Sequence, residues 1–406
     1  MTIVQINMLG STLSTGRTTR QMHDYFCEHD IESYIVCPMK IDCDDAFNFI
    51  SKYEMKLNTL ETICTGLEGY HSIIPTRRLI RYLEKVKPDI VHLRVLHGLG
   101  INMPMLFEYL AKHNIGTVIT LHDLWYITGK CCYYTQMGCN KWMSGCNHCP
   151  DIRRGSRPYL LDQSKKMWMD KQKYINAVPN VAIIGVSDWV KDQAERSILR
   201  KSKIVKRIYN WIDLKKFSPK DTKCIRKELG LESKLVILGV SASWMMNDRK
   251  GLSHYIELAK IMPNDYQIVL VGKMEYTGEL PPNVLSVSTV NSQDRLAELY
   301  SMADVYLNLS MEETFGKVSA EALSCGTPVI AIDSTANKEL VPEGGGVVLS
   351  SLDADSMLKA IAVVKNANKE EVKHICRSFA EANFDMEQNI KEYISVYESF
   401  CGKTCK

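Results

Sequence analysis

The sequence has 406 residues, of which 45% are apolar and 24% are charged, an ordinary balance for a globular protein. No hydrophobic run approaches the about 20 residues that cross a bilayer, and the first residues lack the basic region and small-residue cleavage site of a signal peptide. We therefore exclude a transmembrane protein and expect a cytoplasmic protein of two or three domains.

The charge is unevenly distributed along the chain. Residues 1–212 contain 28 Lys and Arg against 20 Asp and Glu, a net +8, whereas the remainder contains 22 against 27, a net −5. A basic first half suits an acidic partner such as an anionic membrane surface or a lipid diphosphate. A solvated basic surface without such a partner explains the imbalance equally well.

In the first half, buried strands alternate with helices. Helices are expected near Arg17–Glu28 and ending at Ile80–Val86, before Pro88. The expected strands are rich in Val, Ile and Leu without alternation, as in parallel strands covered on both faces. They are Ile3–Met8, Ser33–Cys37, Asp89–Val95, Thr117–Leu121 and Val181–Val186.

Two loops of the first half carry candidate site residues. The segment NMLGSTLSTGRTTRQM, residues 7–22, contains Gly10 and Gly16, either of which permits a tight turn beside a ligand, and Gly16 is preferred. His122 and Asp123 end the strand TVITLHD, so the histidine is expected to point into a ligand crevice. Asp123 is a candidate base; for His122 the alternative is a core histidine bonded to a neighbouring backbone.

A cysteine-rich insertion covers residues 131–149. Cys132, Cys139, Cys146 and Cys149 have the spacing C-x6-C-x6-C-x2-C, which offers four soft ligands for a structural zinc ion, with His148 as a further candidate. An iron–sulfur cluster is the alternative, and the expected cytosolic setting disfavours disulfides. Such an ion would brace a loop, because all four tetrahedral positions would be filled.

The same strand–helix alternation restarts after residue 230. Helices are expected at about 250–262, 293–302 and 317–325. The expected strands are Leu235–Val240, Tyr266–Val271, Asp304–Leu309 and Thr327–Ile332. Together the two halves predict an α/β protein with two Rossmann-like, doubly wound domains facing across a cleft. The predicted boundaries are 1–212, 213–385 and a C-terminal helix at 386–406, with Asn210–Lys223 as the linker.

The most informative segment is SMEETFGKVSAEALSCGTPVIAID, residues 310–333. Glu313 and Glu321 are eight residues apart, close to two helical turns, so both carboxylates can face the same way. Between them, Thr314–Gly316 is a predicted helix start that favours a phosphate, and Gly316 lets a ligand approach the backbone. Carboxylates bind hydroxyl groups, so this pattern suits a polyol joined to a phosphate. The alternative is a surface helix with two glutamates.

This segment resembles the donor-site signature of family 4 of the retaining glycosyltransferases, which have the GT-B fold. The resemblance implies that Glu313 contacts the donor sugar and that Glu321 holds the ribose hydroxyls. Glu339 matches a further acidic position, although the glycines that usually precede it are absent. The segments NWIDLKKFSP, 210–219, and FDMEQNIKEYISVYESF, 384–400, are similar to the interdomain segment and the last helix of that family.

A cationic loop extends the resemblance. In SASWMMNDRKGL, residues 241–252, Lys250 matches a lysine that neutralises the donor diphosphate. The expected arginine, six residues earlier, is Trp244 here, and Arg249 is the candidate that supplies the missing cation; an ordinary basic helix start is the alternative. The donor-binding set implied by the resemblance is completed by Thr314, Phe315, Gly316, Gly16 and Trp244, and His122 is placed near the transferred sugar.

The resemblance implies a retaining glycosyltransferase that moves a hexose-type sugar from a nucleotide diphosphate sugar to a saccharide or lipid-linked acceptor in surface polysaccharide biosynthesis. No DxD-type carboxylates stand out, so no catalytic metal is expected. We expect peripheral attachment to the inner face of the cytoplasmic membrane. The sequence has no stripe of basic and aromatic residues, so a nucleic-acid partner is not expected. The alternatives are a non-catalytic GT-B-like binding protein and a sugar-nucleotide epimerase of the same fold.

Overall fold

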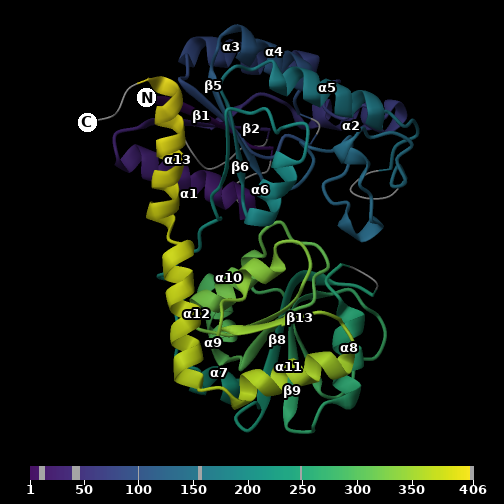
Figure 1. Cartoon of the computed structure of the whole chain (residues 1–406), viewed down its shortest axis with the longest axis vertical. Helices are drawn as coiled ribbons and strands as arrows, with labels where there is room; N and C mark the ends of the chain where they lie inside the picture. The colour runs from purple at the N-terminus through teal and green to yellow at the C-terminus, as the bar shows by residue number, and fades with distance from the viewer. Residues whose placement is uncertain (9–13, 39–45, 99, 154–157, 247–248, 403–406) are drawn as a thin grey trace. The chain divides into compact units, whose positions relative to one another are not determined.

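The structure is a computed structural model that describes residues 1–8, 14–38, 46–98, 100–153, 158–246 and 249–402. The chain divides into two compact units. The N-terminal unit consists of Met1–Ile208 and Ile390–Lys406, and the C-terminal unit of Tyr209–Asn389. Each unit is a parallel sheet covered by helices, so the predicted α/β class with two Rossmann-like domains is confirmed (Figure 1).

Within its described residues, the N-terminal unit has a sheet of seven parallel strands in the order β3-β2-β1-β4-β5-β6-β7. The order reverses between β1 and β4, as in doubly wound sheets. The central strands are fully buried and rich in Val and Ile, as expected for a sheet covered on both faces. The strands are β1 Thr2–Ile6, β2 Glu32–Cys37, β3 Ala46–Asn48, β4 Ile90–Leu93, β5 Gly116–Leu121, β6 Val181–Gly185 and β7 Ile204–Arg207.

Helices α3, α4 and α5 lie together on one face of this sheet, and α1 and the end of α13 lie on the other (Figure 1). Two 3₁₀ turns, Thr135–Met137 and Lys141–Met143, lie in the cysteine-rich insertion. The helices are α1 Ser14–Glu28, α2 Lys52–Thr65, α3 Ile73–Val86, α4 Met103–Lys112, α5 Ser164–Asn176, α6 Asp188–Glu195 and α13 Met386–Cys401.

The described part of the C-terminal unit has a sheet of six parallel strands in the order β10-β9-β8-β11-β12-β13, which reverses between β8 and β11. Its strands are β8 Leu235–Trp244, β9 Tyr266–Met274, β10 Val284–Val287, β11 Val305–Asn308, β12 Val329–Ile332 and β13 Gly346–Leu349. Its helices are α7 Lys223–Glu228, α8 Leu252–Ile261, α9 Gln293–Met302, α10 Lys317–Ser324, η3 Asn337–Leu340, α11 Ala354–Asn366 and α12 Lys369–Asn383.

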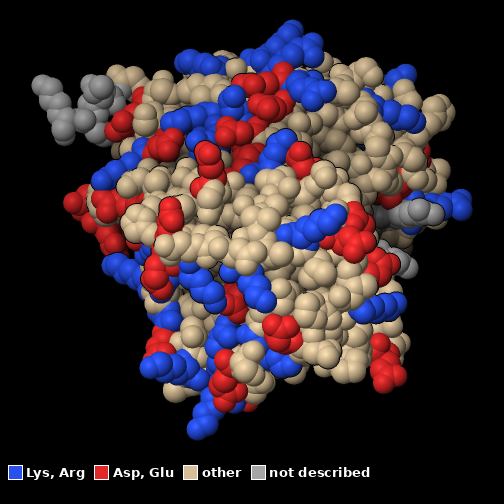
Figure 2. Space-filling view, turned by 60° about the horizontal axis from the view of Figure 1, so that its bottom comes forward, with Lys and Arg blue, Asp and Glu red and all other residues tan. Residues whose placement is uncertain are grey.

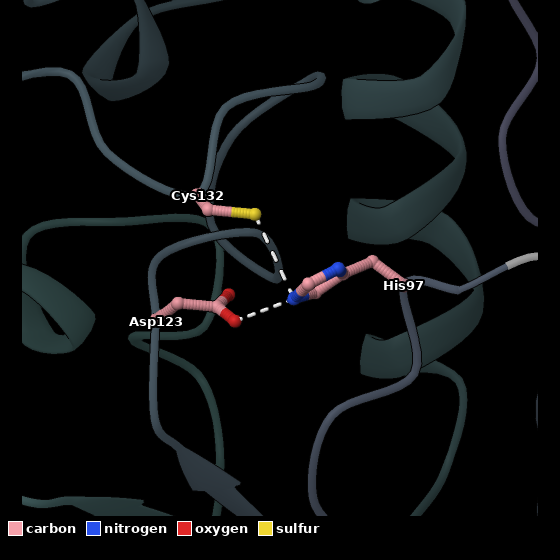
Figure 3. A group of neighbouring side chains, drawn as sticks. All are labelled: His97, Asp123 and Cys132. Atoms are coloured by element: carbon pink, nitrogen blue, oxygen red, sulfur yellow. Dashed lines mark hydrogen bonds and ion pairs between the residues drawn. The ribbon is translucent and has the colours of Figure 1, made fainter. Parts of the chain in front are cut away.

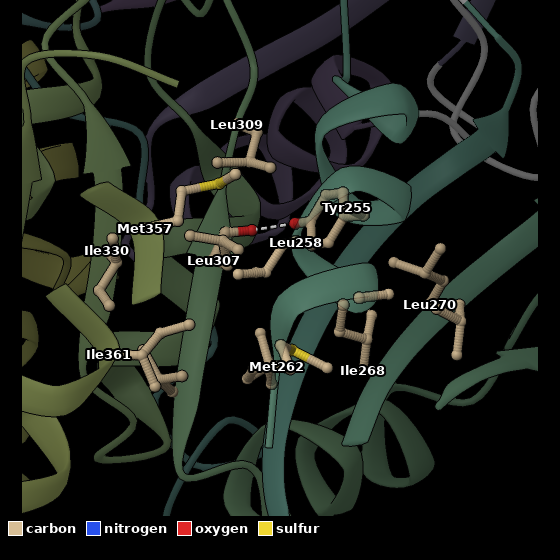
Figure 4. Packing of buried hydrophobic residues seen from close by; sticks show 14 of the residues in the cluster. Tyr255, Leu258, Met262, Ile268, Leu270, Leu307, Leu309, Ile330, Met357 and Ile361 are labelled. Atoms are coloured by element: carbon tan, nitrogen blue, oxygen red, sulfur yellow. Dashed lines mark hydrogen bonds between the residues drawn. The ribbon is translucent and has the colours of Figure 1, made fainter. Parts of the chain in front are cut away.

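Helices α8 and α11 pack on one face of the C-terminal sheet and form a core with it. Tyr255 and Leu258 of α8 meet Leu307 of β11 and Ile361 of α11, and all four are at most 1% exposed (Figure 4). The Tyr255 hydroxyl donates a hydrogen bond to the Leu307 carbonyl, so the one polar atom of that ring is satisfied inside the core.

The last helix, α13, ends in the N-terminal unit. Its residues from Ile390 onward pack with that unit, where the Tyr393 hydroxyl lies 3.0 Å from Thr120 Oγ1 and the Tyr397 hydroxyl 2.8 Å from His92 Nδ1. These contacts make the C-terminal segment part of the fold of the first unit. No described helix has the length and apolar character needed to cross a membrane.

Candidate functional site

The switch points of the two sheets place the predicted site residues. Ligands of doubly wound sheets bind outside the carboxyl ends of the strands where the order reverses. In the C-terminal unit, the loop after β8 carries Arg249 and Lys250, and the loop after β11 carries Glu313. In the N-terminal unit, the loops after β4 and β5 carry His97, His122 and Asp123.

The loop between β8 and α8 is tied closely to the loop after β11. Gly251 caps α8 with φ 78°, and a Cβ there would lie 2.9 Å from Leu309 Cβ and 3.0 Å from its carbonyl oxygen. The Met311 N–H donates to the Arg249 carbonyl at 2.9 Å. Only glycine fits this close approach, which explains the Lys-Gly pair in the sequence.

Lys250 and Glu313 form an ion pair in the C-terminal unit. The two side chains are 23% and 16% exposed, so the pair is largely shielded from water yet reachable. The Glu313 N–H donates to Thr335 Oγ1 at 2.9 Å, and its carbonyl accepts from Ala336 N–H at 3.3 Å. The backbone of Glu313 is therefore fixed by the loop after β12, and its carboxylate is paired with a cation of the loop after β8 that can turn to a phosphate.

The N-terminus of α10 follows directly. Gly316 is its N-cap at φ 87° without a side-chain cap hydrogen bond, and a helix start of this kind is a common place for an anion to bind. Thr314 and Phe315 are buried, and the Phe315 ring packs against Tyr209 at 5.8 Å and Phe384 at 5.6 Å between centroids. Phe315 thus supports the turn by packing.

Two further carboxylates flank this turn. Glu321 on α10 is 6% exposed and accepts a hydrogen bond from the Tyr300 hydroxyl at 3.1 Å. Burial raises the pKa of Tyr300 well above its ordinary value, so the phenol keeps its proton and donates. Glu339 on η3 accepts from the Tyr209 hydroxyl at 3.2 Å. One oxygen of each carboxylate is held in place, which orients the group.

Trp244 is not at the surface of this site. It is 1% exposed, its indole N–H donates to the Val271 carbonyl at 3.0 Å, and its ring packs edge-on against Tyr255. The prediction that Trp244 binds the donor requires a correction, because the side chain belongs to the hydrophobic core. The indole fills the position that the family resemblance gives to arginine, and Arg249 and Lys250 are the cations at the end of this loop.

In the N-terminal unit, His122 lies beside a buried arginine. Arg94 is 1% exposed, and its Nη1 lies 3.4 Å from His122 Nε2 and donates to Thr18 Oγ1 at 3.2 Å. Burial, followed by the charge of Arg94, lowers the pKa of His122 to about 3. His122 is therefore a neutral imidazole near pH 7. Gly16 is buried in the first turn of α1, whereas Gly10 lies outside the described residues.

A third cluster brings together His97, Asp123 and Cys132 (Figure 3). His97 Nε2 lies 2.6 Å from Asp123 Oδ2 and 3.6 Å from Cys132 Sγ. Burial lowers the pKa of His97, but the Asp123 carboxylate outweighs it and raises the pKa to about 11. The two groups therefore form an ion pair near pH 7, so Asp123 is engaged and is a poor free base.

The structure corrects the predicted zinc ligand set. Cys132 points toward His97, whereas Cys131 shares a side-chain hydrogen bond with Cys149, which lowers the pKa of Cys149 to about 7. Cys146 Sγ accepts from the Gly129 N–H at 3.2 Å. Among the described residues, Cys132 converges with His97 and Asp123 and with none of the other cysteines. Spacing could not separate adjacent thiols, because neighbouring side chains in a loop point in different directions.

Sequence reasoning missed two residues of the N-terminal unit, Arg94 and His97. Arg94 follows the buried strand β4, and a charged residue among Val, Ile and Leu was the available signal. His97 lies in the loop after β4, next in the sheet to the strand that carries Asp123, and this adjacency is visible only in the strand order.

Two protein-family models together match most of the chain. Residues 15–216 match the family described as Glycosyltransferase Family 4, and residues 222–381 match the family described as Glycosyl transferases group 1. The chain is 23% identical over 326 residues to the putative colanic acid biosynthesis glycosyl transferase WcaC of Escherichia coli K12, covering 77% of this chain and 76% of that protein.

Solved structures share the fold. Sucrose-phosphate synthase from Thermosynechococcus elongatus has a TM-score of 0.69 at 16% identity, with 99% of each chain covered. Anabaena HepE in complex with UDP-glucose has a TM-score of 0.63 at 14% identity, covering 99% of this chain and 100% of that one. At these identities the likeness establishes the architecture of two Rossmann-like units.

Proposed function

This chain belongs to the group 1, family 4 glycosyltransferases of the GT-B fold, and from that premise we propose that it moves a hexose-type sugar from a nucleotide diphosphate sugar to a saccharide or lipid-linked acceptor. Its relative WcaC is named for colanic acid biosynthesis, which favours a role in surface polysaccharide assembly. A solved structure of the same fold, HepE, holds UDP-glucose, which favours a nucleotide-sugar donor.

The observation that carries this proposal is the Lys250–Glu313 pair beside the N-terminus of α10. A donor offers a diphosphate and sugar hydroxyls at neighbouring positions. Lys250, Arg249 and the N–H groups at Gly316 would stabilise the charge on the departing diphosphate, as preorganised donors do in electrostatic catalysis. Glu313, released from Lys250, would then accept hydrogen bonds from sugar hydroxyls.

Further residues complete the assignment. Glu321, whose carboxylate is oriented by the Tyr300 hydroxyl, would hold the ribose hydroxyls, and Glu339 is a second carboxylate at the same turn. His122 is the catalytic residue proposed for the N-terminal unit. As a neutral imidazole it can exchange hydrogen bonds with hydroxyl groups without attracting the diphosphate.

We propose that the transfer retains the configuration of the anomeric carbon. The oxygen of the acceptor hydroxyl bonds the anomeric carbon on the same face from which the diphosphate leaves. The departing diphosphate takes the proton of that hydroxyl.

A thermal-shift panel tests the donor site. UDP-, GDP-, ADP- and TDP-sugars are added to the wild type, to Glu321→Ala and to a control, Glu343→Ala, whose carboxylate is exposed in the same unit. A ligand present at about 100 times its Kd stabilises the folded state by about 2.7 kcal/mol. We expect one nucleotide family to raise the Tm of the wild type and the control but not of Glu321→Ala. No shift with any donor would indicate a non-catalytic binding protein.

The stereochemistry has its own test. The product made from an α-linked donor is examined by NMR, where the anomeric coupling distinguishes α from β. We expect an α product, because retention preserves the α configuration of the donor. A β product would show that the enzyme inverts the anomeric carbon and would overturn the proposed mechanism.

We also propose that the N-terminal unit docks on an anionic membrane through α2. The exposed face of this helix carries Tyr53, Leu57 and Leu60, which are 84%, 57% and 60% exposed. Lys52 and Lys56 are exposed beside them. Apolar side chains flanked by lysines are the pattern of a helix that lies in the interface of anionic lipid.

The polarity of α2 is inverted relative to an ordinary surface helix. Its buried face is polar: Asn58 donates to Ser72 Oγ at 2.7 Å, and Thr62 is buried with it. Leu160 and Leu161, 73% and 53% exposed, extend the apolar face, since the Leu160 N–H donates to the Ile63 carbonyl. We call Tyr53, Leu57, Leu60, Leu160 and Leu161 the α2 patch.

The net charge of the chain does not by itself account for docking. On the face drawn in Figure 2, basic and acidic side chains are interspersed rather than gathered into an area of one sign. The α2 patch, which joins apolar area to local lysines, is therefore the feature on which the membrane proposal rests.

A further inference from the structure

We propose that His97, Asp123 and Cys132 bind one zinc ion, a ligand set that shares only Cys132 with the four cysteines that the spacing suggested. The three side chains come from separate places: the loop after β4, the end of β5 and the start of the cysteine-rich insertion. Their ligand atoms Nε2, a carboxylate oxygen and Sγ all lie within 4.8 Å of one another (Figure 3).

The separations suit a tetrahedral ion. Zinc bonds of about 2.0 Å to nitrogen and 2.3 Å to sulfur place those two atoms about 3.5 Å apart, and His97 Nε2 and Cys132 Sγ are 3.6 Å apart. Zinc would hold nitrogen and oxygen about 3.4 Å apart. The carboxylate, now 2.6 Å from the ring nitrogen, would therefore open by less than about 1 Å as the ion replaces the shared proton.

The surrounding contacts hold the ligands in this arrangement. The Trp125 N–H donates to Asp123 Oδ1 at 2.9 Å, which leaves Oδ2 for the ion. The Leu124 N–H donates to the Cys132 carbonyl at 3.0 Å and fastens the insertion to the end of β5. The Trp125 indole donates to Glu68 at 3.1 Å and is 1% exposed. Outer contacts of this kind orient metal ligands.

The donor set selects the metal. A thiolate and an imidazole favour zinc over magnesium or calcium, which prefer oxygen ligands, and a carboxylate completes a set found in zinc proteins. A Cys–His–Asp nucleophilic relay is the competing reading. It requires the acid and the thiol on different ring nitrogens, whereas both contact Nε2 of His97 here. Convergence on one nitrogen is the geometry of ligands around an ion.

Three protein ligands leave one position for water or for another oxygen atom, as in zinc sites that are open to ligands. The side chains of His97 and Asp123 are 24% and 12% exposed, so an ion can enter. Asp123 directly follows His122, and the ion would place positive charge next to the proposed catalytic histidine. The site belongs wholly to the N-terminal unit and does not depend on the donor-site assignment.

Cobalt titration of the full-length, metal-stripped, reduced protein tests the site, because cobalt reports thiolate ligation by its charge-transfer absorption. We compare the wild type with Cys132→Ala and His97→Ala, and use the adjacent thiol in Cys131→Ala as the matched control. Removing a true ligand should weaken binding by more than the about 10–100-fold cost of an outer contact. We expect Cys132→Ala and His97→Ala to lose the thiolate band at one equivalent while Cys131→Ala keeps it.

Far-UV circular dichroism and melting without metal show whether each variant is folded. Asp123→Asn, which keeps the shape of the side chain, should weaken cobalt binding in a folded protein. Equal binding by wild type and Cys132→Ala would overturn the proposal, as would loss of binding in Cys131→Ala. Loss of binding in Cys131→Ala would mean that the ion is bound by the other cysteines of the insertion. Because binding is the readout, the outcome is independent of sugar transfer.

Discussion

At the residue scale, Lys250 and Glu313 are expected to act as a unit. Lys250→Met should lower kcat by about 10²–10³-fold, the cost of removing one group that stabilises developing charge. Glu313→Gln should lower it too, and the double variant should lose less than the sum of the two free-energy changes because the residues are in contact. Steady-state kinetics with the donor identified by thermal shift measures this.

A matched control is Lys369→Met. Lys369 also pairs with a carboxylate, Asp304, but it is 75% exposed and Asp304 precedes β11, at the opposite edge of the sheet. Its kcat should stay within about twofold of the wild type, as for most exposed pairs. Equal losses in Lys250→Met and Lys369→Met would mean that general destabilisation, not the site, explains the effect.

The buried histidines predict an acid-sensitive N-terminal unit. Burial and Arg94 lower the pKa of His122 to about 3, and burial lowers that of His92 well below its ordinary value. Below about pH 6.5 the unfolded chain binds these protons and the folded unit does not, so stability falls as the pH falls. His122 alone contributes at most about 2 kcal/mol of that loss at pH 5.

Thermal or urea unfolding at pH 7 and pH 5 checks this prediction. His122→Asn should lose less stability than the wild type between the two pH values. His113→Asn, at an exposed position, should lose as much as the wild type. If His122→Asn followed the wild type as well, His122 would titrate normally in the folded protein.

Single site residues could be predicted from the sequence where a motif fixes both the residue type and its position in the fold. Lys250 and Glu313 lie in turns between a strand and a helix at the carboxyl edge of one sheet, and Glu321 lies on the helix that follows the second turn. Arg94, His97 and the choice between Cys131 and Cys132 could not be read from the chain. Their roles depend on which strands are neighbours and on which way a loop side chain points, and neither is encoded by local spacing.

At the element scale, the helix start at Gly316 makes a specific prediction. Its φ of 87° is in the left-handed region, where a side chain costs roughly 1–2 kcal/mol, and an added Cβ would lie 3.2 Å from Leu340 Cδ1. Gly316→Ala should therefore lower stability by about that amount. It should also weaken donor binding, since the methyl group stands beside the N–H groups proposed to face the phosphate.

Gly230→Ala separates the two effects. Gly230 has φ 67° in the same unit, and an added Cβ would have no heavy atom within 4 Å. It should lose a similar amount of stability and keep full donor affinity, measured by titration calorimetry. If Gly316→Ala bound the donor as tightly as Gly230→Ala, the α10 N-terminus would not be the phosphate site.

The predicted elements that proved right are those with a strong period or a continuous apolar run. β1, β4, β5, β6, β8 and β11 each contain a run of buried residues rich in Val, Ile and Leu, as expected for strands covered on both faces. The strands β3, β7, β10 and β13 went unpredicted because they are three or four residues long and partly exposed. Short edge strands form because a neighbour offers hydrogen bonds, and the local sequence shows little of this.

At the scale of the whole molecule, each unit has its own sheet and core, and the proposed donor groups lie in the C-terminal unit. A donor should therefore protect the C-terminal unit preferentially in hydrogen exchange, because binding stabilises the cooperative unit that holds the ligand. Protection is expected at the β8–α8 loop and around α10. Equal protection in β3 and α2, far along the chain from these segments, would contradict a donor site built mainly by the C-terminal unit.

The α2 patch makes the membrane proposal testable on the intact protein. Each leucine that enters lipid contributes about 1.5–3 kcal/mol, and each nearby lysine about 1 kcal/mol with anionic lipid. Leu57→Gln with Leu60→Gln should thus lower partitioning onto anionic vesicles more than tenfold. Flotation with phosphatidylglycerol vesicles at low salt measures it, and the wild type should bind less at high salt because the lysine contribution is screened.

Val363→Gln supplies the control, since it also replaces an exposed apolar side chain by glutamine, and Val363 is 62% exposed on α11 in the other unit. It should float as the wild type does. Wild-type protein that stays in solution with anionic vesicles would refute docking. Docking would also be refuted if light scattering showed a dimer that the leucine substitutions dissociate, because a second copy of the chain would then cover the α2 patch. The inverted polarity of α2, with Asn58 and Thr62 inside and leucines outside, suits an apolar partner, and the lysines beside the leucines favour anionic lipid.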